Sequence, residues 1–543
     1  RVAGSDVGET TYERYRVYLE CLFDELSRDL GVLFDRFAPE GVLFPREEAL
    51  DDVLGALTDE TVDAVWTEDE TIGWIYQYFH PKSERKGMRD ESQQPRDSHE
   101  MAVRNQLFTP RYVVEFLVDN SLGRYWHEMT QGDTDLTADL DYFVPRENEI
   151  FLGESDEPPQ EADDDLYVAP HRPMKDPREI RLLDPACGSM HFGLYAFDLF
   201  EKIYMEVWDR YPDLREALRD DLGLEEGDRE AFVLEIPRLI VESNLYGVDI
   251  DRRAAQIAGL ALWLRAQRAW SEQGVTPADR PRIRASGIVC AEPMPGEKDL
   301  LDAYVENLEA QGPEGRLLGD LVREIWERMQ IAGEAGPLLK IEREIEDVLE
   351  TARRQFEERQ ERIRRKEGTQ GTFQGMEARE QGTLQFDVTG VEADFFEQAE
   401  ELLLRALQDF AAESSEGTET SRRLFADDAE RGFDFLELMH RGATTGFDVV
   451  VMNPPFGDVS KGAKSYVDEQ YPNTKNDVLE AFVERAEELL DHNGFMGAIT
   501  KRTSFFLSTS GDWRERIVLR RYHPLVLADL GYGVLDAKVE TAA

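Results

Sequence analysis

The side chains best placed to do chemistry stand together in one short turn. Residues 447–452 read Phe-Asp-Val-Val-Val-Met, and Asn453, Pro454, Pro455 and Phe456 follow directly. The β-branched apolar run predicts a buried strand, which the prolines end because proline cannot continue a hydrogen-bonded ladder. The turn therefore lies at the carboxyl end of a strand, where open α/β sheets bind their ligands.

This turn presents an amide, a prolyl carbonyl and an aromatic ring. The Asn453 side-chain oxygen and the Pro454 backbone oxygen can each accept one hydrogen of an –NH2 group, while the Phe456 ring stacks on a planar base. Two acceptors on one amine draw its nitrogen towards tetrahedral geometry, so that its lone pair becomes available for attack. The alternative is an Asn-Pro-Pro turn that only ends a strand, because short motifs also occur by chance.

A second element upstream has the composition of a ligand-binding loop. Residues 180–183 predict a strand, and Asp184, Ala186 and Gly188 lie in the small-residue turn that precedes an apolar helix. Small residues let a ligand approach the backbone closely, and a helix start attracts negative charge. The Gly-x-Gly-x-x-Gly pattern of nicotinamide-binding loops is absent from this turn, which argues against a dehydrogenase.

Three further positions flank this loop. Thr109 and Pro110 predict a capped helix start, with Thr109 as the cap and Pro110 in the first turn, and such a start can bind a carboxylate. Asp249 ends the next predicted strand, where doubly wound folds hold ribose hydroxyls, although a helix cap is the alternative. A third predicted strand, residues 283–291, leads to Glu292.

In this order the motifs resemble the S-adenosylmethionine-dependent amino-methyltransferases of DNA, whose signature is Asn-Pro-Pro-Phe/Tyr. The resemblance implies that the turn at Asn453 activates the amine of the substrate. It also implies that Asp249 binds the ribose of S-adenosylmethionine and that Glu292 binds the adenine amine of this cofactor. The cofactor-binding positions that it implies are Phe108, Thr109, Asp184, Ala186, Gly188, Asp249 and Glu292. The sequence departs from the family at Met190, where a glycine is usual.

The motif order is the gamma-type arrangement of these enzymes, and the sequence is most similar to PglX-type methylases of BREX phage defence and to the methylase part of type IIG restriction-modification enzymes. This implies methyl transfer to N6 of a flipped-out adenine in double-stranded DNA, with other phage-defence or restriction subunits as partners and without a metal. Three alternatives stay open: an RNA adenine methyltransferase, a protein-glutamine methyltransferase, and a non-enzymatic binding subunit with a degenerate cofactor pocket.

The charge of the chain at first argues against a nucleic-acid partner. Acidic residues number 113 and basic residues 62 among 543, giving a net charge of −51. The acidity is spread along the chain and arginine outnumbers lysine, a pattern typical of halophilic proteins, in which high salt screens self-repulsion. Local positive charge then matters more than the total. We therefore expect DNA contacts from the basic residues that follow the catalytic turn, Lys461, Lys464, Lys501 and Arg502.

These elements predict an α/β fold, a Rossmann-like methyltransferase sheet with helices on both faces. We expect a helical N-terminal domain at 1–105 with a mobile linker at 81–100, a cofactor half at 106–299, a charged helical insertion at 300–444 and a catalytic half at 445–543. The three cysteines form no CxxC pair, which predicts neither a zinc site nor a disulfide framework. No apolar run approaches the length of a membrane span, so we expect a cytoplasmic protein.

Overall fold

The computed structural model describes residues 10–26, 44–157, 159, 166–294, 296, 298–367, 384–415, 419–535 and 539–543. The chain divides into two compact units. The first comprises residues 1–290, 334–338 and 441–543, and the second comprises residues 291–333 and 339–440. The division into four domains at residues 105, 299 and 444 stays a prediction.

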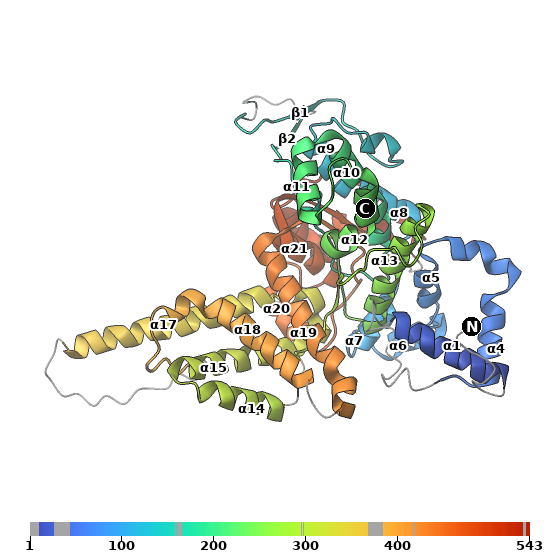
Figure 1. The fold of residues 1–543 in the computed structure, drawn as a ribbon. Helices are drawn as coiled ribbons and strands as arrows, with labels where there is room; N and C mark the ends of the chain where they lie inside the picture. Colours follow the sequence, from blue (N-terminus) through green and yellow to red (C-terminus); the bar gives the residue numbers. More distant parts are fainter. Residues whose placement is uncertain are drawn as a thin grey trace. The chain divides into compact units, whose positions relative to one another are not determined.

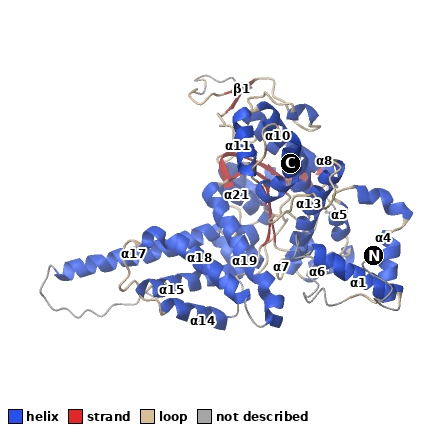
Figure 2. Cartoon of the chain, in the orientation of Figure 1, coloured by secondary structure: helices blue, strands red, loops and turns tan. Residues whose placement is uncertain are grey.

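A five-stranded parallel sheet forms the centre of the first unit (Figure 2). Its order is β5-β4-β3-β6-β7. The strands are β3 (Leu182–Asp184), β4 (Leu245–Asp249), β5 (Gly287–Cys290), β6 (Phe447–Met452) and β7 (Leu490–Ala498). The chain runs outwards from β3 to β5, then returns to the other side of β3 to form β6. The order therefore reverses between β3 and β6, and such a reversal point opens a crevice at the carboxyl ends of the strands.

Both faces of this sheet are covered, as β6 shows. All six of its residues are buried. Val449 and Val451 belong to one hydrophobic core with residues of helices α8 (Arg111–Val118), α10 (His191–Arg210) and α13 (Arg252–Glu272). Alternate residues of a strand face opposite sides, and helix α21 (Val478–Leu489) contacts β6 and β7 without contributing to that core. The prediction of an α/β sheet is confirmed.

A small antiparallel sheet follows β7. Its order is β8-β10-β9, formed by Thr500–Lys501, Glu540–Ala542 and Asp529–Tyr532. Only Ile499 separates β7 from β8, and its N–H donates to the Met452 carbonyl at 3.0 Å. Strands β9 and β10, near the end of the chain, pair with each other in antiparallel orientation.

The remaining elements of the first unit are mostly helical. Around the core lie the π-helical turn η2 (Asp119–Gly123), α9 (Arg124–Met129), α11 (Pro212–Leu222), α12 (Arg229–Leu239) and α20 (Lys464–Gln470), with a parallel strand pair, β1 (Glu149–Phe151) and β2 (Tyr167–Ala169). The short 3-10 and π elements are η3 (Leu136–Asp139), η4 (Pro177–Glu179), η5 (Ile240–Asn244), η7 (Gly336–Leu338), η8 (Arg502–Phe505), η9 (Ser508–Ser510) and η10 (Trp513–Val518). None of the helices in the described part of the chain combines the length and apolarity that crossing a membrane requires.

The N-terminal part is helical, as predicted, but the expected mobile linker at 81–100 is wrong. The elements are α1 (Thr11–Leu26), α4 (Glu47–Leu57), η1 (Glu60–Thr67), α5 (Thr71–Gln77), α6 (Lys82–Glu91) and α7 (Ser98–Asn105). The polar composition hides a buried network: Arg104 donates to Glu100 at 2.9 Å and to the Met88 carbonyl at 2.6 Å. Because these charged groups pair with one another and with backbone carbonyls, the segment folds without a large apolar face.

The second unit is a group of helices. It contains α14 (Lys298–Glu309), α15 (Pro313–Arg328), η6 (Met329–Ile331), α17 (Ile341–Glu367), α18 (Phe395–Ser415) and α19 (Glu419–Thr445) as far as residue 440, and α16 (Ala332–Ala335) spans its boundary. Helix α15 contacts α14, α17 and α18, which lie side by side in Figure 1. These helices lie in the part of the chain, residues 300–444, for which the sequence predicts helical structure.

Candidate functional site

One pocket lies at the carboxyl ends of β3, β4 and β6, at the reversal point of the sheet. It is lined by most of the residues that the sequence singles out: Phe108, Thr109, Asp184, Ala186, Gly188, Asp249, Asn453 and Pro455. Pro454 is buried beside it and Phe456 is half-buried. Glu292 belongs to the second compact unit, and its contact with a cofactor stays a prediction.

Two hydrogen bonds from backbone N–H groups fix the loop after β3. The Asp184 carboxylate accepts from the Ala186 N–H at 3.1 Å, and the Cys187 N–H donates to the Val248 carbonyl of β4 at 3.0 Å. Gly188 has a positive φ of 53°, and a Cβ there would lie 3.2 Å from the Phe108 ring. Glycine thus serves both the backbone conformation and the close approach of Phe108.

Met190, the departure from the family pattern, keeps the conformation that a glycine would adopt. Its φ is 66° and its ψ is 36°, in the left-handed region, and it directly precedes α10. The side chain is fully buried and packs on Gly193, where an added Cβ would lie 2.5 Å from the Met190 Cε and 2.7 Å from its Cγ. The loop therefore retains its turn, and the space for the larger side chain comes from a glycine three residues later.

Asp249 braces this loop through both of its oxygens. Oδ2 accepts from the Gly188 N–H at 2.9 Å and Oδ1 accepts from the Asp251 N–H at 2.7 Å. Burial raises the pKa of the Asp249 carboxyl to about 7, and the nearby Asp251 adds to the rise. Burial also raises the pKa of Asp184 well above its usual value. A hydroxyl donor that entered the pocket would stabilise the ionised form of Asp249.

The helix start near Thr109 differs from the prediction in its register. Helix α8 begins at Arg111, Pro110 is the capping residue with an extended ψ of 144°, and no side chain caps the helix. Thr109 therefore lies one residue before the cap, where it is buried and lines the pocket. The reason is that Pro110 has a carbonyl placed to accept from Val113 and Val114, so Thr109 is left to face the pocket.

Asn453 carries an unsatisfied acceptor. Its Nδ2 donates to the Leu107 carbonyl at 2.8 Å, which fixes the side-chain amide. Its Oδ1 is buried and has no hydrogen-bond partner among the described residues. Because a buried polar atom without a partner costs about 1–3 kcal/mol, such an atom in a pocket is suited to a ligand that brings a donor.

Residues 94–105 brace the turn that follows β6, and this role was missed from the sequence. Asn105 accepts from the Phe456 N–H at 3.0 Å through its Oδ1. Gln94 donates through its side chain to the Val459 carbonyl at 3.0 Å, and the Lys461 N–H donates to the Pro95 carbonyl at 3.1 Å. No local pattern could have shown these contacts, since they join residues more than 340 positions apart.

Three of the four basic residues expected to contact DNA form ion pairs. Lys501 pairs with Asp477, and its Nζ lies 5.9 Å from the centre of the Phe456 ring. Lys464 pairs with Asp468 at 2.8 Å. Arg502 pairs with Asp529 at 2.8 Å and with Glu540 at 2.9 Å. Lys461 is exposed. Exposed ion pairs such as those of Lys464 and Arg502 contribute little to stability, whereas the Lys501 and Asp477 side chains are each only 17% exposed. The DNA contacts of the four basic residues stay a prediction.

Other residues of the pocket were missed because they come from the N-terminal helices. They are Tyr76, Met101, Ala102, Asn105 and Gln106. One sequence signal pointed to these helices, the aromatic stretch Gly-Trp-Ile-Tyr-Gln-Tyr-Phe at 73–79. Such an apolar composition is unusual for a helix that is exposed on all sides, so it indicates that part of the stretch packs against the core.

The order of the parallel sheet reverses at β3, and ligand-facing groups follow three strands: a glycine turn after β3, an acid after β4 and an amide turn after β6. These features define the Rossmann-like class of α/β proteins that bind a ligand at the switch point. Comparison with known proteins refines this class. The family model of the Eco57I restriction-modification methylases matches residues 243–534, and that of the MmeI DNA-methyltransferase domain matches residues 172–279. The first match spans more than half of the chain, so the chain belongs to the Eco57I restriction-modification methylase family.

Two curated relatives are similar along most of the chain. Adenine-specific methyltransferase BrxX of Escherichia coli O9:H4 (strain HS) is 25% identical over 492 residues, which cover 84% of this chain and 31% of that protein. Adenine-specific methyltransferase PglX of Lacticaseibacillus casei (strain Zhang) is 24% identical over 506 residues, which cover 92% of this chain and 33% of that protein. The chain thus spans about a third of the length of these relatives.

Proposed function

We propose that this chain transfers a methyl group from S-adenosylmethionine to N6 of an adenine flipped out of double-stranded DNA. The observation that carries the proposal is the buried, unpartnered Oδ1 of Asn453 in a pocket that also holds Gly188 and Asp249. The pocket thus combines an acceptor for an amine, Asn453 Oδ1, with a glycine loop and an acid, Asp249, that are suited to a nucleoside. Family membership and the two adenine-specific relatives support the same reaction.

The residues present fit such a cofactor. Gly188 and Phe108 line the pocket side by side, Asp249 can accept from ribose hydroxyls, and Thr109 lies in the pocket near the start of α8. The bound cofactor would supply an electrophilic methyl group. The remaining task of the chain is to bind, orient and exclude water, since positioning and hydrogen bonding suffice for a direct transfer.

On the acceptor side, Asn453 Oδ1 and the Pro454 carbonyl would each accept one hydrogen of the adenine amine, while Phe456 covers the ring. The hydrogen bond from Asn453 Nδ2 to Leu107 aims Oδ1, and Asn105 holds the Phe456 backbone. The transfer would form the bond between the amine nitrogen and the methyl carbon as the bond between that carbon and the cofactor sulfur breaks. The methylated amine would then lose one proton to bulk solvent when the product leaves the pocket. Flipping the base costs a few kcal/mol, which stacking and these hydrogen bonds offset.

The proposal extends to the setting in which the enzyme works. We propose DNA as the substrate and a role in phage defence or restriction-modification, with S-adenosylmethionine as the cofactor and other defence subunits as partners. Met190 gives no support to a degenerate pocket, because the loop keeps a left-handed residue at this position.

The test compares three kinds of cells: cells that carry the parent gene, cells that carry the Asn453→Ala variant and cells that lack the gene. Sequencing that detects N6-methyladenine should find modified DNA sites only with the parent. In vitro, label from S-adenosylmethionine that appeared in RNA or in protein instead of DNA would redirect the assignment to one of those substrates. Failure of the parent to bind S-adenosylmethionine in calorimetry would support a non-enzymatic binding subunit.

A further inference from the structure

Helix α5 (Thr71–Gln77) lies against the ligand pocket. It contacts α13, and four of its seven residues, Thr71, Gly73, Tyr76 and Gln77, are buried. Gly73 permits a close approach, since an added Cβ would clash with the Ser189 side chain and lie 2.7 Å from the His191 Nε2 at the start of α10. The neighbouring Trp74 packs on Phe108 and on His191, with ring centres 6.1 Å and 5.4 Å apart.

Tyr76 is the α5 residue that lines the pocket. Its side chain is 6% exposed, and its hydroxyl donates to the Asp251 Oδ2. Asp251 Oδ1 accepts from the Arg253 N–H at 3.1 Å, and Asp251 itself lines the pocket next to Asp249. Burial and the bond to Asp251 raise the pKa of the Tyr76 phenol well above its ordinary value, so that the phenol stays protonated.

This arrangement leaves Tyr76 with free acceptor capacity. A phenol has one hydrogen to donate, and here it is committed to Asp251, so the lone pairs of the phenol oxygen remain for a donor from the ligand. The carboxylates of Asp249 and Asp251 stand beside it with their orientation fixed by backbone N–H groups. The phenol oxygen and the two carboxylates together offer acceptors to a ligand, which suits a neutral group with two hydroxyl donors, and a ribose supplies such a group.

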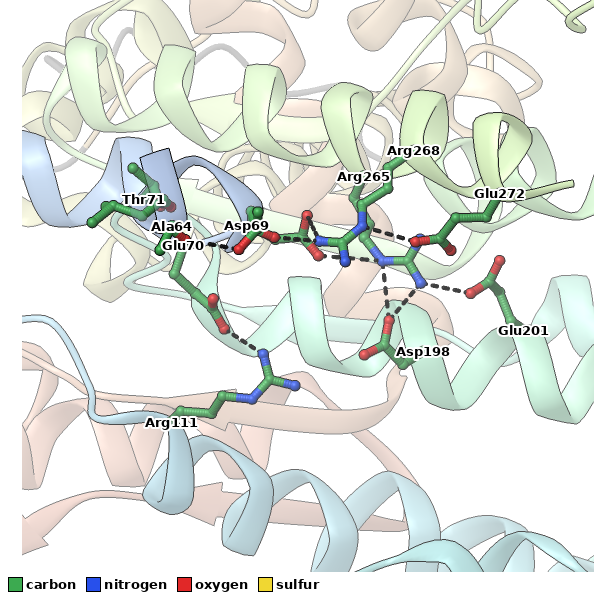
Figure 3. A network of polar contacts seen from close by, with 12 residues as sticks. Ala64, Asp69, Glu70, Thr71, Arg111, Asp198, Glu201, Arg265, Arg268 and Glu272 are labelled. Atoms are coloured by element: carbon green, nitrogen blue, oxygen red, sulfur yellow. Dashed lines mark hydrogen bonds and ion pairs between the residues drawn. The ribbon is translucent and has the colours of Figure 1, made fainter. Parts of the chain in front are cut away.

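A network of ion pairs docks this helix onto the core (Figure 3). Asp69, just before α5, pairs with Arg268 of α13 at 3.0 Å, and Arg268 also donates to the Thr67 carbonyl at 2.8 Å. Glu70 pairs with Arg111 of α8 at 2.9 Å. Asp69 further lies 3.6 Å from Arg265, which is largely buried and is held by Asp198 and Glu201 of α10. The position of Tyr76 thus depends on contacts with three helices of the core.

We propose that α5 is a built part of the cofactor site, and that Tyr76 accepts a hydrogen bond from a ribose hydroxyl of the cofactor while it positions Asp251. This inference rests on the proposed function, since it names a further binding residue for the same cofactor. Under this proposal the N-terminal helices contribute a residue that binds the cofactor.

The test uses Tyr76→Phe, which removes one oxygen and leaves the ring in place. Adenosine and 2′,3′-dideoxyadenosine compete with labelled S-adenosylmethionine for the parent, for Tyr76→Phe and for Tyr78→Phe. Tyr78 is the matched control, because it follows α5 directly and is 65% exposed. The preference of Tyr76→Phe for adenosine should fall by roughly three- to tenfold, the range of one net hydrogen bond, while Tyr78→Phe keeps the parent's preference.

An unchanged preference in Tyr76→Phe, or an equal loss for both nucleosides, would overturn the assignment, since a merely structural tyrosine would weaken both ligands alike. Such a result would leave the proposed function standing as long as the parent binds S-adenosylmethionine. If the parent itself did not bind S-adenosylmethionine, the proposed function would fail first.

A second comparison tests the docking of α5. Arg268→Gln removes the contacts to Asp69 and Thr67, whereas Arg229→Gln removes a similarly exposed ion pair between α12 and Asp209 of α10. We expect weaker binding of S-adenosylmethionine in Arg268→Gln, by about threefold or more, and unchanged binding in Arg229→Gln. Equal affinities of the two variants would show that the docking of α5 does not matter for the site.

Discussion

Asn105 accepts a hydrogen bond from the backbone N–H of Phe456 at 3.0 Å, and these two residues lie 351 positions apart in the chain. The bond joins the end of α7 to the turn that carries the proposed catalytic group. The Asn105 amide is itself anchored, since its Nδ2 donates to the Met101 carbonyl at 3.1 Å. The turn at Asn453 is therefore held from outside the sheet, by a segment whose sequence gives no hint of it.

The first prediction concerns this brace. Asn105→Ala should lower the rate of methyl transfer by about tenfold or more, because a turn misplaced by a fraction of an ångström loses its alignment with the reacting atoms. Asn105→Asp keeps an acceptor for the Phe456 N–H and should retain more of the rate. Single-turnover kinetics on a mapped DNA substrate measure both, and equal rates in the two variants would argue against the brace.

The second prediction concerns the amine-binding group. Asn453→Ala should abolish methyl transfer and leave the affinity for S-adenosylmethionine nearly unchanged, because the side-chain oxygen is proposed to meet the base and not the cofactor. Calorimetry and a labelled-methyl assay separate the two effects. Wild-type turnover in this variant would remove Asn453 from the mechanism.

The third prediction concerns Asp249 and pH. Its carboxyl has a raised pKa of about 7 in the free protein, and the ionised form is the better acceptor for ribose hydroxyls. The affinity for S-adenosylmethionine should therefore rise as the pH increases towards about 7 and then level off. Asp249→Asn should lose this dependence, and Asp249→Ala should weaken binding by about 1.5–3 kcal/mol. A parent whose affinity is flat between pH 5.5 and 8 would contradict the assignment.

The same group links pH to stability. The folded-state pKa of Asp249 lies above its unfolded value, so the folded protein holds more protons than the unfolded chain between about pH 4 and about pH 7. Its contribution to the free energy of unfolding is therefore greatest below about pH 4 and is lost as the pH rises through about 7. Asp249→Asn should reduce the fall in urea midpoint across this window relative to the parent.

The fourth prediction concerns the glycine loop. Gly193→Ala should destabilise the fold by about 1–3 kcal/mol, because its Cβ would overlap the Met190 side chain in a packed core. Met190→Gly alone removes a buried side chain and should also destabilise. In Met190→Gly/Gly193→Ala each change relieves the other, so the loss should be smaller than the sum of the single losses. Urea unfolding of the four proteins measures this coupling, and additive losses would show that the two positions are independent.

The fifth prediction concerns DNA. Lys461→Glu combined with Lys464→Glu should weaken binding to duplex DNA and reduce its salt dependence, because each lost phosphate contact lowers the slope against log salt by about 0.9. Lys501 is better left intact in this test, since its partner Asp477 caps α21 and contacts the Gly457 N–H. Lys202→Glu serves as the control, since Lys202 pairs with Asp139 on the surface of α10. If the double variant and this control bind DNA alike, the DNA path lies elsewhere.

The sequence by itself determined the strands and the turns that end them. The β-branched run at 447–452 and the prolines after it define β6 and the position of Asn453, because strand propensity and proline sterics act locally. The small residues at 186–189 and the acidic residue Asp249 likewise predict turns that face a ligand. Because the strands are parallel, their carboxyl ends lie at one edge of the sheet, and the residues that follow them lie close together.

Tertiary structure decided which other residues join them. Three contacts link segments that sequence patterns treat separately: the hydrogen bond from the Phe456 N–H to Asn105, the bond from Tyr76 to Asp251 in the pocket, and the ion pair of Lys501 with Asp477. The polar composition of residues 81–100 predicts a mobile linker, but in the folded protein Glu100 pairs with Arg104, and composition cannot show which charges will be paired. Met190 was ambiguous for a related reason, since a left-handed methionine is tolerable only where a glycine such as Gly193 leaves room for its side chain, and that room exists only in the folded core.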